Sequence, residues 1–558
     1  RDTPSLNPHH GVLLANRCDL FFFPPSPTQP QGDMVSLQDQ TFTSSARPLM
    51  AEGSRSALTL GSAGGKHGSR DMEGGRNSES TVSEHHKLGW IVTALFIVAD
   101  MVGGGVVAMP VAFTLSGLHM GVFFMVSIAL VFLYTGWQLG VVWNIMQERW
   151  PEYHDHCRKP FPEIAKRSMG PRAKKFTSLL INVTLFGICV VYLLLSANIA
   201  HYFVDNFLPD PFRISYCWTI VVLAVMLLPF TYLKSPADFW PVIVLAMVTT
   251  TLAVIAIVTG VLRDAPVCKP AAHFPPVETN KVIISIGTFL FAFSGHFVFP
   301  SIQHDMREPK KFSWSVSLGF LLVVMLYMPL STISFWVYGN SMESSVIYSV
   351  QTYWLQCFAN FMIAVHCILT LVIVVNPVNQ ELEHFFKVAH HFGKGRVALR
   401  TSVLAAVCFV GLTVPDFLPV MGVVGASTIP LGCVVLPSLF YLWINAAEEY
   451  EWQKNKIPSL MDVLRRTKKT TLAWNIFLLV LAVGGGAIAT GISITDLKDT
   501  NFKPPCYLSV FVDQGNVTFG GGDAGGHGFS QHCCGEFKNV SSFLSSCGGE
   551  HATSSLLV

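Results

Sequence analysis

The chain has 558 residues, of which 51% are hydrophobic and 13% are charged, and its mean hydropathy is +0.46. A soluble domain carries charge on about a quarter of its residues, so this composition excludes a soluble globular protein. The formal net charge of +2 indicates no polyanionic partner, and we expect no binding to nucleic acid.

The first 87 residues differ in composition from the rest. Early apolar runs are interrupted by Arg17 and Asp19, so the sequence predicts no signal peptide. From Pro24 to Lys87 the chain is rich in Ser, Gly, Pro and charge and nearly free of aromatics, which is typical of disorder. The predicted parts are a disordered cytoplasmic segment over 1–87, a membrane domain over 88–496 and an extracytosolic tail over 497–558.

Eleven apolar segments of membrane-spanning length follow. A single apolar chain crosses a bilayer as helices unless it closes into a barrel, and these segments lack the alternation of barrel strands. We therefore predict an all-α integral membrane protein. The ninth segment is short, and merging it with the tenth would leave ten spans. The predicted spans are roughly 90–113, 119–143, 177–201, 216–234, 239–262, 282–301, 315–338, 354–375, 400–415, 419–442 and 472–495.

Lysine and arginine gather in every second connection between these spans. If the N-terminus is cytoplasmic, the inner connections hold most of the positive charge, and the outer ones offer little beyond Arg213, Arg263, Lys269 and Lys281. Positive charge in short loops marks the cytoplasmic side, so we predict a cytoplasmic N-terminus. An odd number of spans then places the tail outside the cytosol.

Glycines interrupt the first span. Gly103, Gly104 and Gly105 lie inside the apolar segment 90–113, and Pro110 follows them. A helix broken in hydrocarbon leaves backbone groups unpaired at considerable cost, unless those groups line a cavity and bind something. Free amides at the start of the second half-helix favour an anion such as a carboxylate. The alternative is close helix packing on small residues.

Asp100 lies in the same span, shortly before the break. A carboxylate at this depth costs roughly 2.5–3.5 kcal/mol on insertion scales, so it should face a cavity or a partner. Its two functional interpretations are binding of a cationic group or metal ion, and uptake and release of a proton. The structural alternative is a helix cap, in which Asp100 accepts hydrogen bonds from Val102 or Gly103.

A matching interruption occurs in the span 282–301, where Ser294, Gly295 and His296 follow an aromatic run. Paired breaks in corresponding halves of a membrane chain indicate the substrate site of a transporter. Unwound carbonyls here would accept hydrogen bonds from an ammonium group, with Phe293 in the pocket wall. His296 is a proton acceptor, a gate, or a core histidine with a hydrogen-bond partner.

His366 and Thr370 lie four residues apart in the eighth span and share one helix face. If that face meets the first span, the pair joins Asp100 in an ion or proton site. The alternative is a polar contact between helices. The sequence shows no metal-ligand spacing, nucleotide loop or nucleophile elbow, so we expect neither a metal nor an organic cofactor.

The predicted outer face carries candidate modifications. Asn516 and Asn539 begin glycosylation sequons in the tail, which also contains cysteines, and both features suit an extracytosolic compartment. Cys217, at the outer end of the fourth span, and Cys268, in the next outer connection, form the candidate disulfide. The alternative is two unpaired thiols.

Three motifs resemble the amino acid/auxin permease family. The segment Phe289–Gln303 has the pattern of an aromatic-rich helix, Gly-His, Val-Phe-Pro and Gln, and His304–Pro309 continues it with a Met–basic–x–Pro turn. Gly103–Phe113 resembles the opening motif of that family, and Asn376-Pro377-Val378 fits the end of its eighth span. The resemblance covers about residues 86–495.

This resemblance implies an inverted repeat like that of the bacterial leucine transporter. Spans 1–5 and 6–10 would form its halves, spans 1 and 6 would be the broken helices, and one extra span would follow. The resemblance further implies transport of small neutral amino acids or their relatives, usually with protons and in some branches with sodium. The first break would hold the substrate carboxylate and the second its ammonium.

The leading hypothesis is a secondary active transporter of small amino acids, proton-coupled, in the plasma membrane or a lysosomal or vacuolar membrane. Asp100 leaves open a sodium-coupled or amine transporter of the same fold. A second hypothesis is a transceptor, which senses amino acids and signals through the N-terminal segment. A third, an intramembrane enzyme, lacks a nucleophile and base at suitable spacing. No protein partner is indicated.

Overall fold

A computed structural model describes residues 88–155, 157, 159–232, 240–274, 276–388, 393–499 and 505–508. Within these residues the regular secondary structure is helical, apart from one isolated parallel bridge between Leu88 and Met306. The segment 1–87 and the sequons at Asn516 and Asn539 lie outside the described residues. Disorder and glycosylation there stay predictions.

The long helices follow the predicted spans closely. Their bounds are α2 (Trp90–Met101), α3 (Gly104–Ser116), α4 (Leu118–Arg149), α7 (Pro171–Phe207), α8 (Tyr216–Thr231), α9 (Trp240–Ala271), α10 (Thr279–Ala292), α11 (Phe299–His304), α12 (Phe312–Tyr338), α14 (Tyr353–Phe385), α15 (Lys394–Thr413), α16 (Phe417–Pro430), α17 (Leu436–Ala446) and α20 (Lys469–Asp499). The connections contain α5 (Glu152–Asp155), α6 (Pro160–Met169), α13 (Val346–Ser349), α18 (Glu449–Gln453), α19 (Leu460–Arg466) and the 3-10 turns η1 (Asp210–Phe212), η3 (Pro309–Lys311) and η4 (Gly339–Ser341). A π-helical turn, η5 (Leu431–Val435), joins α16 to α17.

Eight of the described helices are long and apolar enough to cross a membrane, when α16, η5 and α17 are counted as one helix. The pair α2 and α3, bent by 61°, adds a ninth. Two shorter apolar helices, α8 and α10, lie where the fourth and sixth spans are predicted. The all-α membrane fold is therefore confirmed, whereas the count of eleven spans stays a prediction. The weak ninth segment forms its own helix, α15, because Asp416 caps the start of α16 by accepting from the Leu418 amide at 3.2 Å.

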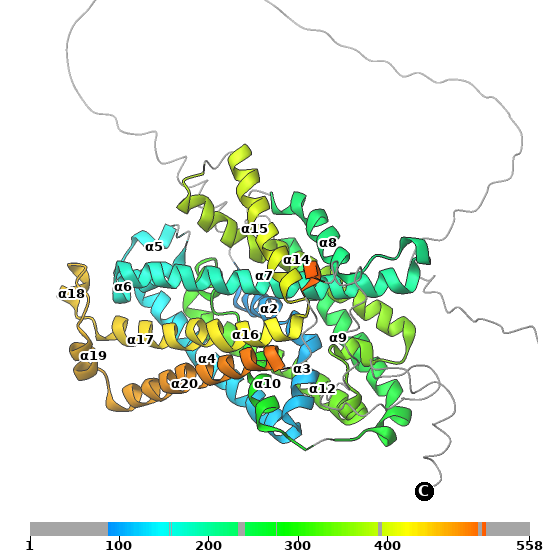
Figure 1. Ribbon diagram of the computed structural model, residues 1–558. Coiled ribbons are helices and arrows are strands. Elements are labelled where there is room, and N and C mark those ends of the chain that lie inside the picture. The colour runs from blue at the N-terminus through cyan, green and yellow to red at the C-terminus, as the bar shows by residue number, and fades with distance from the viewer. Residues whose placement is uncertain are drawn as a thin grey trace, which may run out of the picture. The chain divides into compact units, whose positions relative to one another are not determined.

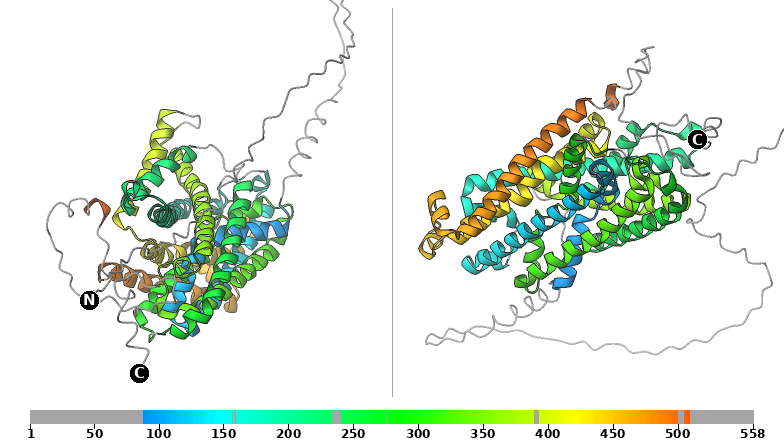
Figure 2. Two further views of the ribbon diagram at one scale, coloured as in Figure 1. Left: turned by 90° about the vertical axis from the view of Figure 1, so that its right-hand side faces the viewer. Right: turned by 90° about the horizontal axis from the view of Figure 1, so that it is seen from below.

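The long helices run side by side as a bundle (Figures 1 and 2). Within it, α3 packs on α10, α4 on α12, α7 on α14 and α8 on α15. These pairs hold equivalent places in the two halves of the predicted repeat, so each of these elements contacts its own counterpart. The extra helix of that prediction, α20, packs along α16 and α10.

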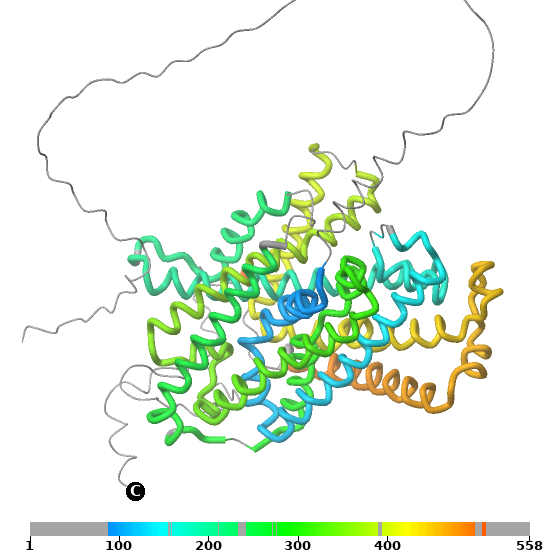
Figure 3. The backbone as a smooth tube through the Cα atoms, turned by 180° about the vertical axis from the view of Figure 1, so that it is seen from behind, coloured from blue at the N-terminus to red at the C-terminus, as the bar shows by residue number. Residues whose placement is uncertain are grey.

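Both predicted breaks are present. The first lies between the end of α2 at Met101 and the start of α3 at Gly104, and the second between Ala292 of α10 and Phe299 of α11. Because α3 lies along α10, the two interruptions meet within the bundle. Figure 3 shows the blue α2 and α3 crossing its middle.

Two backbone hydrogen bonds join the beginning of the first broken span to the end of the second. The Leu88 amide donates to the Asp305 carbonyl at 2.9 Å, and the Arg307 amide donates to the Leu88 carbonyl at 2.9 Å. Leu88 lies just before α2, and Asp305 follows α11 directly. The beginning of the first broken span is therefore tied to the end of the second.

The predicted partner of Cys217 is wrong. Cys217, at the start of α8, is bonded to Cys506, which follows α20, and their Cα atoms lie 5.6 Å apart. This separation is ordinary for a disulfide. Cys268 is instead fully buried near the end of α9. The chain leaving α20 returns to the beginning of α8, a proximity hidden by a sequence separation of 289 residues.

Candidate functional site

Asp100 lies in the last turn of α2 and is half-buried. Its carboxylate faces the second break, since a Cβ atom added at Gly295 would lie 2.9 Å from Oδ2 of Asp100. Among the described residues this carboxylate is paired with no cation and accepts no hydrogen bond. The Val102 amide donates to the Val98 carbonyl at 2.8 Å rather than to Asp100, which argues against the capping alternative.

Two glycines of the first break differ in how tightly they are covered. A Cβ atom at Gly105 would lie 2.7 Å from Cβ of Ala292 and 2.9 Å from the Tyr327 hydroxyl. Real Cβ atoms essentially never come within 3.0 Å of such neighbours, so only glycine fits here. At Gly104 the nearest neighbour, Met421, would lie at 3.5 Å, an ordinary contact.

Gly103 faces two polar side chains. A Cβ atom there would overlap the Tyr192 hydroxyl and would lie 2.8 Å from Nε2 of His366. The Thr370 hydroxyl lies 3.2 Å from the same nitrogen. The helix face that carries His366 and Thr370 therefore does meet the first break, which is the geometric condition for a joint site with the α2 carboxylate.

The other ring nitrogen of His366 fixes its tautomer. Nδ1 lies 3.0 Å from the Ala246 carbonyl oxygen and 2.6 Å from the Thr250 hydroxyl, both on α9. A carbonyl only accepts, so we assign the proton to Nδ1. Nε2 then keeps its lone pair on the side of the first break, where it can accept a proton or an N–H group.

Two tyrosines that the sequence analysis did not single out complete this site. The Tyr327 hydroxyl of α12 lies 3.1 Å from the Met101 carbonyl and 3.4 Å from the Ala292 carbonyl, the last residues of α2 and α10. The Tyr192 hydroxyl of α7 lies against the first break, where a Cβ atom added at Gly103 would overlap it. A polar group in an otherwise apolar span was the one signal in the sequence.

Two residues predicted to line the pocket are engaged elsewhere. Nε2 of His296 lies 3.0 Å from the Phe132 carbonyl and 3.0 Å from the Thr135 hydroxyl, both on α4. Phe293 stacks on Phe320 of α12, with ring centroids 6.4 Å apart. Both side chains are fully buried. This packing favours the core-histidine alternative for His296 and a packing role for Phe293.

The rest of the second break is held by short-range contacts. The Ser294 hydroxyl donates to the Phe291 carbonyl at 2.7 Å, which helps to end α10. The amides of Gly295 and His296 face the thiol of Cys433 in the π-helical turn η5. Single π-helical turns occur frequently at functional sites. The second break is thus bordered by α2, α12 and η5.

The chain matches a known protein family over most of its length. Residues 86–479 match the family described as "Transmembrane amino acid transporter protein". The chain belongs to this family. The matched range contains both breaks, Asp100, His366 and the two tyrosines. Membership confirms the resemblance seen in the motifs and identifies a multi-pass membrane transporter rather than an enzyme.

Curated members of the transmembrane amino acid transporter family are distant relatives. "Amino acid transporter AVT1E" of Arabidopsis thaliana is 23% identical over 356 residues, 61% of this chain and 64% of the relative. "Lysine histidine transporter-like 6" of the same plant is 25% identical over 397 residues, 67% and 87% of the two chains. "Vesicular inhibitory amino acid transporter" of Xenopus tropicalis is 25% identical over 373 residues, which are 63% of this chain and 69% of the relative. The match thus spans just under two thirds of the length of the AVT1E relative.

Two solved structures match at lower sequence identity. MhsT in complex with L-phenylalanine gives a TM-score of 0.48 at 9% identity, over 73% of this chain and 99% of that chain. The inward-facing conformation of Mhp1 gives a TM-score of 0.46 at 13% identity, over 74% of this chain and 92% of that chain. The two matches cover the helical bundle at low identity.

Proposed function

We propose that this chain is a secondary active transporter of small amino acids, coupled to protons and working by alternating access. The observation that carries the proposal is the carboxylate of Asp100, unpaired among the described residues and directed at Gly295, in a chain of the amino acid transporter family. An ionisable group inside a membrane span is costly and is retained where it binds or exchanges a charge.

The two breaks offer complementary groups to the two ends of an amino acid. The start of α3, at Gly104 and Gly105, presents backbone amides and the positive end of a helix dipole, which suit a carboxylate. The second break presents backbone carbonyls beside Asp100, which suit an ammonium group. Because the breaks meet where α3 packs on α10, one small zwitterion would span both.

The site is closed in the structure. Gly103, Gly104 and Gly105 are buried, and Gly105 touches Ala292 closely. Substrate would therefore enter only after α3 separates from α10 or α7. Alternating access supplies such a movement of one helix group against another.

We assign the coupling proton to Asp100. Tyr192 lies against Gly103, beside Nε2 of His366. Protonation of Asp100 would remove its charge while the occupied site crosses the membrane, which lowers the electrostatic cost of the conformational change. His366 would be a neighbouring acceptor for the same proton.

A second candidate function rests on the same carboxylate. In its ionised form Asp100 would pair directly with an amine substrate or with Na⁺, and no proton would move. The absence of a paired cation among the described residues is compatible with this alternative. The test must therefore separate charge pairing from proton exchange.

We further propose that the N-terminus is cytoplasmic and that the tail lies outside the cytosol, in a plasma, lysosomal or vacuolar membrane. The Cys217–Cys506 bond supports this orientation, since it joins the start of α8 to the segment after α20. Both cysteines would thus lie on one face, and disulfides persist in extracytosolic compartments.

Uptake by the purified protein in liposomes tests the proposal. We expect labelled small amino acids to accumulate when the lumen is alkaline, without sodium. Accumulation that requires sodium would assign the coupling to that ion instead. Failure to accumulate any amino acid under either gradient, with binding retained, would contradict transport and favour the sensor hypothesis.

The variant Asp100→Asn separates the two roles of the carboxylate. If Asp100 carries the proton, uptake by this variant should no longer respond to the pH gradient. The matched control is Asp264→Asn, because Asp264 is also buried in a span but already accepts from the Tyr338 hydroxyl and the Gln351 amide, each at 2.7 Å. The control should keep its pH response. An unchanged pH response of Asp100→Asn with weaker substrate affinity would instead assign the carboxylate to substrate binding.

A further inference from the structure

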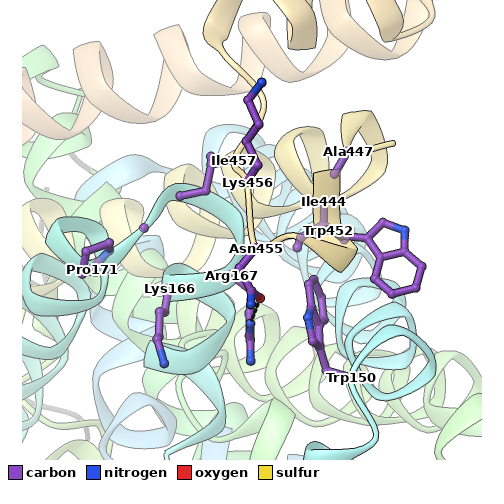
Figure 4. A pocket seen from close by; sticks show the side chains of 11 residues that line it. Trp150, Lys166, Arg167, Pro171, Ile444, Ala447, Trp452, Asn455, Lys456 and Ile457 are labelled. Atoms are coloured by element: carbon purple, nitrogen blue, oxygen red, sulfur yellow. Dashed lines mark hydrogen bonds between the residues drawn. The ribbon is translucent and has the colours of Figure 1, made fainter. Parts of the chain in front are cut away.

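A cavity of about 370 Å³ lies away from the helix breaks (Figure 4). Its lining includes Trp150 after α4, Lys166 and Arg167 of α6, Trp452 of α18 and Lys456 in the loop that follows. None of the described residues that line it carries a carboxylate. The cavity is therefore a pocket with three basic side chains and aromatic walls.

This pocket lies where spanning helices end. α4 ends at Arg149, α7 begins at Pro171 and α17 ends at Ala446, all beside the cavity. Tryptophan concentrates at this level of membrane proteins. Trp150 and Trp452 meet there edge to face, with ring centroids 6.0 Å apart. The pocket thus lies at the ends of spanning helices, on the side where the sequence places most of its positive charge.

Arg167 is fixed in position within this pocket. Its Nε donates to the Tyr153 hydroxyl at 3.0 Å, and its guanidinium carbon lies 4.8 Å from the centre of the Trp150 ring. Arg167 also donates to Asn455 and forms an ion pair with Glu152, which lies outside the lining, so part of its charge is already balanced. A guanidinium held in this way needs little reordering to bind an anion, which favours affinity.

Two lysines lie on either side of Arg167 in Figure 4. Lys456 forms no ion pair with a described carboxylate, and the nearby Glu451 of α18 and Asp462 of α19 pair with Arg466 instead. Lys166 lies 3.8 Å from Glu163, which is also paired with Lys174. Burial opposes ionisation of Glu163, but the lysines hold its pKa below the usual value. Lys174 therefore balances Glu163, and Lys166 keeps charge available for a ligand.

We propose that this pocket binds a phosphate-bearing anion, either the headgroup of an anionic membrane lipid or a soluble compound with the same phosphate chemistry. Arg167 supplies a planar donor suited to phosphate, and the two lysines supply mobile point charges. Basic pockets between spanning helices bind such headgroups on the cytoplasmic side. The pocket shares no residue with the proposed transport site.

Binding of a fluorescent short-chain phosphatidylinositol bisphosphate to the purified full-length protein tests this proposal. Two lysines near a headgroup contribute roughly 1 kcal/mol each, so Lys166→Gln with Lys456→Gln should weaken binding about thirtyfold. The matched control is Lys175→Gln with Lys468→Gln, which removes the same charge from exposed positions outside the pocket. That control should bind within about twofold of the wild type.

Competition by soluble inositol trisphosphate distinguishes the two sources. Displacement of the lipid at similar concentration supports a soluble phosphate ligand, and failure to displace supports a membrane lipid. The single variant Lys456→Gln changes an exposed loop residue and should still lose about fivefold, which guards against a folding defect. No saturable binding by the wild type, or equal losses in the pocket and control variants, would overturn the proposal.

Discussion

At the scale of single residues, one hydroxyl group serves both helix breaks. Tyr327 lies within hydrogen-bonding distance of the last carbonyls of α2 and α10. A backbone carbonyl left unpaired away from water costs several kcal/mol, so this side chain stabilises two interruptions that are distant in sequence. The same hydroxyl borders Gly105, which makes the position sensitive to any added atom.

We predict that Gly105→Ala reduces the initial rate of amino acid uptake by about tenfold or more. The new methyl group would press on Ala292 and Tyr327, and overpacking of this kind costs about 1–3 kcal/mol. Gly104→Ala is the matched control, since its methyl group would make only ordinary contacts. Uptake should be normalised to reconstituted protein. Equal activity of the two variants would show that α3 and α10 are not packed as described.

The residues of the candidate site were predictable to different degrees. Asp100 and Gly295 are conspicuous in apolar segments, so their types and positions identify them. Tyr327 is not conspicuous, because tyrosine is ordinary in membrane helices and its role depends on the carbonyls that it meets. His296 has the chemistry of a functional group, and only its contact with Phe132 and the rest of α4 shows that it packs within the protein.

At the scale of elements, two runs of three glycines behave differently. The run 103–105 interrupts a span, whereas the run 484–486 lies within the continuous helix α20. The first run is covered by side chains that include those of α7, α10 and α12, whereas a Cβ atom added at Gly484 or Gly485 would meet no other helix within 4 Å. Glycine therefore permits a break, and the groups that satisfy the freed backbone stabilise it. The sequence predicted both breaks from glycines that interrupt apolar segments in corresponding halves of the chain.

The closest approach of α10 and α16 gives a prediction for helix packing. A Cβ atom at Gly425 would overlap the Gly287 carbonyl oxygen, so Gly425→Ala should force the helices apart and lower the thermal unfolding temperature in detergent. Gly485→Ala is the control, and it should be neutral or slightly stabilising because alanine favours a helix by about 0.5–1 kcal/mol. Similar unfolding temperatures for both variants would contradict the packing of α10 on α16.

At the scale of the whole molecule, composition and apolar segment length were enough to predict an all-α membrane protein, since both reflect the solvent in which the chain folds. Long-range pairing was not predictable in the same way. Compartment limits which cysteines are able to pair, but only the path of the chain brings Cys217 close to Cys506 instead of Cys268.

Peptide mapping without reduction checks this pairing. Protein prepared with alkylation of free thiols should yield a peptide containing Cys217 linked to one containing Cys506, because their Cα atoms lie 5.6 Å apart. Cys506→Ser should release Cys217 for alkylation, whereas Cys268→Ser should leave the linked peptide unchanged. A linked peptide containing Cys217 and Cys268 would contradict the described arrangement.

The two hydrogen bonds between Leu88 and the loop of Asp305 and Arg307 tie the start of α2 to the end of α11, so a displacement of either end would act on the other. Leu88 is also covalently continuous with the 87 residues before it. A molecule that binds those residues and shifts Leu88 would therefore change the relative free energies of the open and closed arrangements. Linkage is reciprocal, so substrate occupancy would alter the affinity for that molecule by the same factor. Through this connection, binding to the N-terminal segment and the balance between open and closed arrangements of the membrane domain would be thermodynamically coupled.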